Sequence, residues 1–298
     1  MSPELQDVLF DALRKSEWLS NWRKAQREPA LSYVGSFSLS SSPEAAATDI
    51  RHELDLGQTP GLGLKDSSEL FSLLVTKAER VGLVVLRTGK VFDNTRRKLS
   101  AEEFRGFAIA DPFAPLVFVN TNDWQAARVF TLAHELAHIW LGESGISNPD
   151  PREPSSVSER EVEKWCNSVA AELLVPGSSL QALWRKTEAP CHQIRRMSRH
   201  FKVSSFVILL RSFEIGLINE DVRRDCWDAL ASEIGERRSK GSGGDFYASF
   251  FARNSLSFTR TVISAAIEGN ITYRAAAQLL KTNLRTMDKA AKRLGLAD

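Results

Sequence analysis

The sequence predicts an α+β protein that is mostly helical and has a small antiparallel sheet. Apolar residues recur at helical spacing in four stretches, residues 1–30, 67–81, 178–234 and the last sixty of the chain. Two β-prone runs, FRGFAIA at 104–110 and LVFVN at 116–120, flank a turn that contains two prolines. The stretch that follows them, FTLAHELAHIWLG at 130–142, is apolar and carries two histidines.

The N-terminal part is predicted to be helical with one flexible joint. Residues 1–30 carry leucines and tryptophans at near-helical spacing, which fits one or two amphipathic helices. The run SFSLSSSPEAAA at 36–47 is rich in serine and small residues and predicts a joint. Residues 67–81 resume the helical pattern, and Gly82 is the expected end of that helix before LVVLRTG, which has the composition of a strand.

The chain after the histidines predicts a loop and then another helix. Residues 142–156, GESGISNPDPREPSS, have the composition of a loop. We expect a helix to begin near Ser158, because Ser158 and Glu161 fit the S-x-x-E capping box. Pro176 and Gly177 are expected to end it.

These elements divide the chain into four predicted regions. RRSKGSGGD at 237–245 has the composition of a linker. The regions are an N-terminal helical region, a mixed core, a helical extension of helix-turn-helix type and a basic C-terminal helical domain, at residues 1–60, 61–180, 181–236 and 237–298.

Composition and charge exclude several classes of protein. With 43% hydrophobic and 26% charged residues, the 298-residue chain resembles ordinary globular proteins. Its net charge of +2 is too small for a protein that coats nucleic acid as a whole. The sequence has neither a signal-peptide pattern nor about 20 consecutive apolar residues, so we expect a cytoplasmic protein that does not contact a membrane. Its three cysteines, Cys166, Cys191 and Cys226, are odd in number and far apart, which predicts reduced thiols.

The two histidines of the apolar helix predict a metal site. His134 and His138 are four residues apart, so on a helix they share one face and can bind one ion. Glu135 lies next to the first of them and can accept a proton from a water molecule. In a chain with five histidines, the H-E-x-x-H pattern arises by chance with a probability of about one in a hundred. The alternative is a pair of structural histidines, but burying two imidazoles and a carboxylate without a metal is costly.

A catalytic zinc usually has three protein ligands, so one more is needed. Position 144 is a serine, which excludes the third histidine of the metzincin pattern. On the next predicted helix, Glu161 and Glu172 point away from the apolar face, whereas Glu159 and Glu163 lie on it. The helix dipole alone explains an acid at Glu159, in the first turn. Glu163 is therefore the predicted third ligand.

Two segments together resemble the ImmA/IrrE family of metallopeptidases. They are FTLAHELAHIWLG and EKWCNSVAAELLVP, at residues 130–142 and 163–176. RGFAIADPFAPLVFVN and HFKVSSFVILLRSFEIGLI are similar to the strand and helical segments of the same family, so the resemblance covers roughly residues 65–215. Residues 1–60 depart from those family members that begin with an XRE helix-turn-helix, which argues against operator binding by this end.

The resemblance implies a zincin-like core of the gluzincin type, H-E-x-x-H…E. It implies that His134, His138 and Glu163 bind one divalent metal ion, with zinc expected and manganese as the alternative, and that Glu135 is the catalytic base. It further implies an endopeptidase that cleaves an XRE-type helix-turn-helix repressor and thereby derepresses phage, mobile-element or stress-response genes. For the strand at 116–120, two interpretations stay open, pairing with an extended substrate and a place in the sheet core.

The C-terminal region concentrates positive charge. Residues 237–298 contain eleven Lys and Arg against four Asp and Glu. Two short helices joined by KTNLR loosely fit a helix-turn-helix whose second helix presents Arg285, Lys289, Lys292 and Arg293 as candidate contacts to DNA or to a protein partner. A solvated basic face without a partner is the alternative.

The sequence therefore supports two functions. The first is the metal-dependent endopeptidase. The second is a DNA-associated transcriptional regulator or toxin–antitoxin component whose metal site is structural or sensory. A purely structural zinc site normally closes its fourth position with Cys or His and needs no adjacent glutamate, which favours the first.

Overall fold

The fold is α+β and mostly helical, as predicted. The computed structural model describes residues 1–147, 157–185, 187–234 and 245–297. Its helices are α1 (Pro3–Ala25), α2 (Pro43–Glu53), α3 (Ser67–Arg80), α4 (Gln125–Leu141), α5 (Val157–Leu174), α6 (Gly177–Leu183), α7 (Pro190–Phe201), α8 (Ser205–Glu214), α9 (Glu220–Ile234), α10 (Phe246–Asn254), α11 (Leu256–Ile267), α12 (Tyr273–Leu279) and α13 (Leu284–Arg293). Its strands are β1 (Val84–Thr88), β2 (Gly106–Ile109), β3 (Leu116–Asn120) and β4 (Gly145–Ser147).

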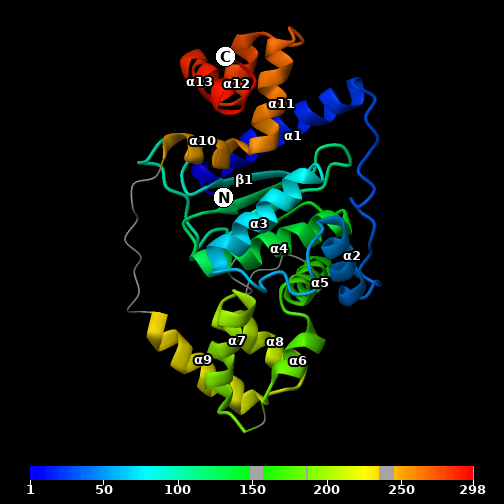
Figure 1. Cartoon of the computed structure of the whole chain (residues 1–298), viewed down its shortest axis with the longest axis vertical. Coiled ribbons are helices and arrows are strands. Elements are labelled where there is room, and N and C mark those ends of the chain that lie inside the picture. Colours follow the sequence, from blue (N-terminus) through cyan, green and yellow to red (C-terminus); the bar gives the residue numbers. More distant parts are fainter. Residues whose placement is uncertain (148–156, 186, 235–244, 298) are drawn as a thin grey trace.

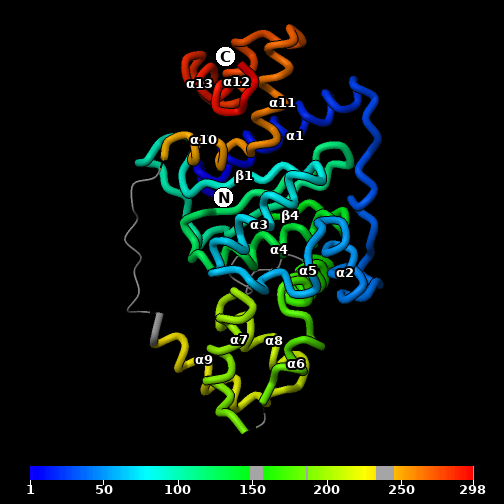
Figure 2. The backbone as a smooth tube through the Cα atoms, viewed as in Figure 1, coloured from blue at the N-terminus to red at the C-terminus, as the bar shows by residue number. Residues whose placement is uncertain are grey.

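The elements form three tiers (Figure 1). The sheet lies in the middle with α2 to α5 on one side, and α6 to α9 form a helical group below them. On the other side of the sheet, α1 and α10 pack next to the C-terminal helices α11 to α13, which form the opposite end of the molecule (Figure 2). The mixed core is therefore enclosed between two helical groups.

The sheet is mixed, which corrects the prediction that it is antiparallel. Its strand order is β1-β3-β2-β4, with β3 parallel to β1 and antiparallel to β2, while β4 is antiparallel to β2. The predicted hairpin is present as β2 and β3, with Phe107 paired to Phe118. The hairpin places β3 between β1 and β2. In this position β3 runs antiparallel to β2 and parallel to β1. Strand β4 has only three residues, which is too short for an alternating apolar pattern to indicate it in the sequence.

The position of β3 settles the two interpretations of residues 116–120. All five residues of β3 are buried, and both edges of the strand are paired within the sheet. A strand bonded on both edges has no backbone groups left for another chain. The interpretation that this strand pairs with substrate is therefore wrong, and β3 belongs to the sheet core.

Alternating side chains of the sheet enter two separate cores. Val85, Val117 and Val119 pack against α3, α4 and α5, whereas Leu86 and Phe118 face the opposite core. This alternation follows from the two-residue period of a strand. The opposite core is filled by α1 and α10 to α13, so the two ends of the chain pack together.

Contacts between Trp18 and Phe258 illustrate this packing of the chain ends. Their rings meet edge to face with centroids 5.8 Å apart. Burial of each such aromatic side chain contributes on the order of 2 kcal/mol.

The four predicted region boundaries stay predictions.

Two local predictions are wrong. Residues 36–47 are not a joint throughout, because α2 begins at Pro43, Ser42 caps it by accepting a hydrogen bond from the backbone N–H of Ala45, and Ala46 and Ala47 are fully buried. The second wrong prediction is the capping box: α5 begins at Val157, which confirms a helix start near Ser158, but Ser158 lies inside the helix and is not its cap. Within the predicted loop at 142–156, residues 145–147 instead form β4, and residues 148–156 lie outside the described residues.

A disulfide between Cys191 and Cys226 corrects the prediction of reduced thiols. It links α7 to α9, with Cα atoms 5.4 Å apart, a separation typical of disulfides. The helices are brought together by α8, which contacts both of them, and sequence spacing does not show this. Cys166 is free and buried in the core. Within the described part of the chain, no helix combines the length and the apolar character that a membrane span needs.

Candidate metal centre

Helix α4 places the two histidines at the base of the sheet. It packs against β2, β3 and α5, and it ends at Gly142, whose φ of +78° forms a left-handed cap. Glu135 is fully buried, and His134 and His138 are 5% and 1% exposed. Burial of three ionisable side chains on one helix is costly unless they have partners.

The structure brings together the three predicted ligands. The Nε2 atoms of His134 and His138 are 3.1 Å apart. Each lies 3.2 Å from a carboxylate oxygen of Glu163, which reaches them from α5. The three ligand atoms all lie within 4.8 Å of one another, a group able to hold one metal ion. Two histidine ligands from α4 and one carboxylate ligand from the adjacent α5 thus face a single point, as a three-ligand metal site requires.

The hydrogen bonds of the histidines fit metal binding. Nδ1 of His134 lies 3.0 Å from Oδ1 of Asn167, and because a carbonyl oxygen only accepts, the ring proton is on Nδ1. The lone pair of Nε2 therefore faces Glu163 and His138. An outer partner that fixes the tautomer in this way is usual for metal-binding histidines. Asn167 was not identified from the sequence, although it lies one helical turn after Glu163 on the same face.

Glu163 is ionised. Burial opposes ionisation, but when the rings of His134 and His138 are both protonated, their hydrogen bonds and charge lower the pKa of Glu163 to about 2. Its side chain is 39% exposed, and Asn167 is also exposed. The centre is thus open to solvent along one side of α5, which leaves room for a water molecule or a substrate.

Glu135 is the most unusual carboxyl group of the site. Burial raises the pKa of Glu135 to about 7, the charge of His138 opposes this rise, and nearby Glu163 adds to it. The hydroxyl of Ser147 also faces Glu135 and opposes the rise, yet its geometry falls short of a hydrogen bond. Both carboxyl oxygens of Glu135 lack a hydrogen-bond partner among the described residues. Unsatisfied buried oxygens of this kind point to a role in binding water or substrate.

Two glycines make room for these side chains. A Cβ atom at Gly106 of β2 would lie 2.6 Å from Oε1 of Glu135, closer than real Cβ contacts allow. A Cβ at Gly145 of β4 would lie 3.3 Å from the ring of His138. The sheet therefore approaches the site through positions without side chains, and β4 becomes the strand next to the histidines.

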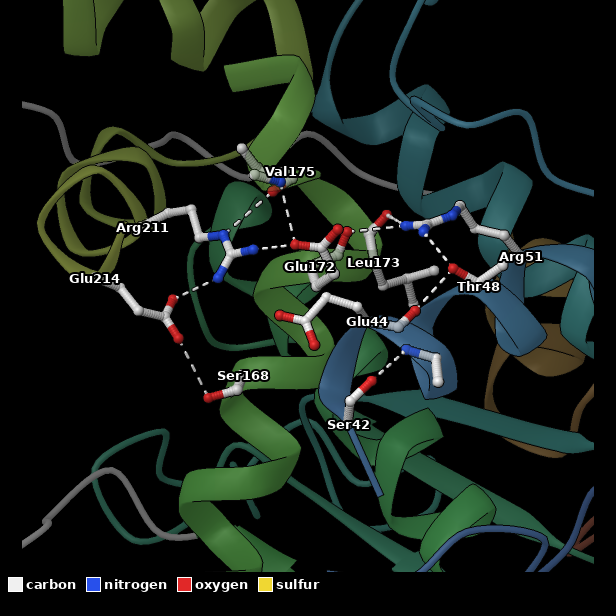
Figure 3. Close-up of polar contacts among 12 residues, drawn as sticks. Ser42, Glu44, Thr48, Arg51, Ser168, Glu172, Leu173, Val175, Arg211 and Glu214 are labelled. Atoms are coloured by element: carbon white, nitrogen blue, oxygen red, sulfur yellow. Dashed lines mark hydrogen bonds and ion pairs between the residues drawn. The ribbon is translucent and has the colours of Figure 1, made fainter. Parts of the chain in front are cut away.

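The other glutamates of α5 lie elsewhere. Glu159 and Glu161 are exposed near the start of the helix. Glu172 points away from the metal residues, as predicted, but it is buried, with 7% of its surface exposed. It binds Arg211, which also binds Glu214 at 2.7 Å, while Arg51 donates to the backbone carbonyl of Glu172 at 2.9 Å (Figure 3).

The basic residues of the C-terminal region lie far from this centre, beyond the other face of the sheet. Arg285, Lys289 and Lys292 are exposed on α13. Arg293 instead forms an ion pair with Asp245 at 3.1 Å, and its guanidinium lies 4.1 Å from the ring centroid of Tyr247. It thereby ties α13 to α10.

Sequence comparison with known families agrees with this geometry. The family model described as IrrE N-terminal-like domain, a peptidase family, matches residues 78–213, which include both histidines, Glu135 and Glu163. A second model, described as a domain of unknown function (DUF8813), matches residues 254–293. No curated protein matches the chain significantly. The match of residues 78–213 to the IrrE N-terminal-like domain of the M78 peptidase family confirms the resemblance to ImmA/IrrE metallopeptidases.

Proposed function

We propose that this chain is a metal-dependent endopeptidase whose catalytic base is Glu135. One observation carries the proposal, namely that Glu135 is fully buried with both oxygens unpaired beside three converging ligand atoms. A structural metal site has no use for such a group, because it usually binds four protein ligands and leaves no open side. Here Glu163 and Asn167 leave one side exposed.

His134, His138 and Glu163 would hold the ion, and Asn167 orients the first histidine. Two imidazoles and a carboxylate suit zinc, with manganese as the alternative. When bound, the ion would acidify a water molecule and polarise the scissile carbonyl.

Glu135 performs the proton transfers in this mechanism. A carboxyl group with a pKa of about 7 is half ionised near neutral pH, so it both accepts and returns a proton readily. Its Oε atom takes the proton of the attacking water and delivers it to the leaving amine of the substrate. Gly106 keeps the space for this carboxyl group between β2 and α4.

The substrate is proposed to bind beside β4 as an extended segment. One edge of β4 is paired with β2, and among the described residues no strand occupies the other. The strand places Gly145 against His138 and Ser147 towards Glu135. A peptide that pairs with this edge by backbone hydrogen bonds would bring its carbonyl groups to the ligand atoms.

The proposed substrate is a helix-turn-helix repressor of the XRE type, whose cleavage would derepress phage, mobile-element or stress-response genes. The resemblance to ImmA/IrrE proteins supports this choice. A cytoplasmic location is part of the same proposal, because repressors act there. The Cys191–Cys226 disulfide weighs against that location, since disulfides are rare in the reducing cytosol.

The test uses Glu135→Gln with candidate repressors encoded near this protein. Cleavage should fall by at least about 100-fold, because general base catalysis contributes 10²–10⁴ in rate, while bound metal per chain stays at the wild-type value. Glu163→Gln should lose the metal as well, and Glu161→Gln, an exposed glutamate of the same helix, should change neither. Wild-type cleavage by Glu135→Gln would refute the role of the base. Metal binding without cleavage of any protein would favour the regulator with a sensing or structural site.

A further inference from the structure

We propose that residues 254–293 form a helix-turn-helix unit that binds duplex DNA through the exposed face of α13. Arg285, Lys289 and Lys292 would contact the phosphate backbone. This inference goes beyond the peptidase and does not depend on it, because the two sites lie on opposite sides of the sheet.

The three C-terminal helices have the geometry of such a unit. Four residues, 280–283, separate α12 from α13, the length of a helix-turn-helix turn. Lys281 in this turn has a φ of +48°, the left-handed conformation that a tight turn between two helices requires. The side chains of Thr272 and Asn283 cap α12 and α13 by accepting backbone N–H bonds. Helix α11 packs against both and completes a three-helix core.

Helix α13 separates its apolar and basic residues. Met287, Ala290 and Ala291 are buried against α11 and α12. The exposed face carries Arg285, Lys289 and Lys292, which recur at intervals of four and three residues and therefore form one basic stripe, with Asp288 as the one acid within it. A helix fits the major groove of B-DNA, where such a stripe meets the flanking phosphates.

The cations of this stripe form no ion pair within the described part of the chain. Among the described residues, Arg285, Lys289 and Lys292 have no ion pair or side-chain hydrogen bond, whereas Arg293 on the same helix is paired with Asp245. A stripe of unpaired cations is available to a partner of opposite charge. Arg293 holds α13 in place and is left out of the proposed contact.

The charge of the whole chain is concentrated in this unit. Residues 254–293 contain seven Lys and Arg against two Asp and Glu, a net charge of +5. The rest of the chain contains thirty-two against thirty-five, a net charge of −3. Such an asymmetry attracts a polyanion to one end of the molecule and keeps it away from the other. Duplex DNA is the partner whose charge and groove dimensions fit.

The experiment measures binding of the full chain to a fluorescent duplex of mixed sequence, about 30 base pairs or roughly three helical turns long. Three phosphate contacts should give a log–log salt slope of about −2.7, so affinity should fall about 40-fold between roughly 50 and 200 mM salt. The triple variant Arg285→Gln, Lys289→Gln, Lys292→Gln should bind at least about tenfold more weakly at the lower salt and with a slope near zero.

Three further variants make the result specific. Lys65→Gln, Arg80→Gln, Arg224→Gln removes three exposed cations elsewhere and should bind as the parent does. Asp288→Asn removes the one acid of the stripe and should tighten binding a few-fold, a gain that misfolding does not produce. Glu135→Gln should leave DNA binding unchanged, which separates this proposal from the peptidase.

Several outcomes would overturn the proposal. They are no binding at the lower salt, parental binding by the α13 triple variant, or equal losses in both triple variants. If DNA does not bind but the α13 variant weakens capture of a candidate repressor, the stripe is a protein-docking surface and the DNA proposal is wrong.

Discussion

The metal centre and helix α13 hold their charges in opposite ways. On the side of α4 and α5, Glu135, His138 and Glu172 are buried, and the histidines and Glu172 have partners within hydrogen-bond distance. On α13, Arg285, Lys289 and Lys292 are exposed and have no ion pair among the described residues. Burying a charge costs free energy, so a buried charge indicates a specific partner or a role in a reaction. An exposed cation costs little free energy, so it is informative only through its pattern along a helix.

The largest expected effect concerns the Arg211–Glu172 pair between α5 and α8. Arg211→Ala leaves the Glu172 carboxylate buried without its cation, which should lower the free energy of unfolding by about 3–5 kcal/mol. Arg223→Ala on α9 removes a cation from an exposed pair and should cost less than about 1 kcal/mol. Urea unfolding of both variants measures the difference. Equal effects would mean that burial does not decide the cost of losing one cation of a pair.

A pH dependence of the metal-free protein is the next effect. The pKa of Glu135 is raised to about 7 from an ordinary value of 4.5, so the folded state holds its proton more tightly than the unfolded state. Its stabilising contribution is complete below pH 4.5 and is lost as the pH rises through 7, a change on the order of 3 kcal/mol. Glu135→Gln should remove this loss. Urea unfolding of both chelator-treated proteins between pH 5 and 8 measures it, and parallel pH profiles would contradict the assigned burial of the charge.

The smallest of the three effects concerns Asn167, the partner of His134 Nδ1. Asn167→Ala removes the group that fixes the tautomer, which should weaken zinc binding by about 10–100-fold with little change in the free energy of unfolding. Competition with a zinc chelator measures the affinity. Asn167→Asp accepts the same hydrogen bond and should retain tight binding. If the alanine variant binds zinc normally, Asn167 is only a surface residue.

The sequence allowed the metal residues to be predicted because their relation is local. His134, Glu135 and His138 lie within one helical turn, and the 3.6-residue period determines their faces before any tertiary contact forms. The facing argument also singled out Glu163. Asn167 is on the same face one turn later, but an exposed asparagine carries no signal until its distance to His134 is known.

Long-range contacts account for most of the errors. The disulfide joins cysteines 35 residues apart in sequence, and β4 pairs with β2 although β3 and all of α4 lie between them in sequence. Glu172 was expected to lie away from the inner face, and it is buried on that second face by contacts with Arg51 of α2 and Arg211 of α8. In each case the partner comes from a distant segment, and no local pattern encodes it.

The sequence by itself determined the helices, the hairpin and the H-E-x-x-H face, since backbone geometry and apolar spacing act over a few residues. Tertiary structure decided that β3 lies in the middle of the sheet, that Glu135 is buried without a partner, and that the basic stripe of α13 is free while Arg293 is not. These properties depend on which distant surfaces exclude water from a side chain, and only the folded chain brings those surfaces together.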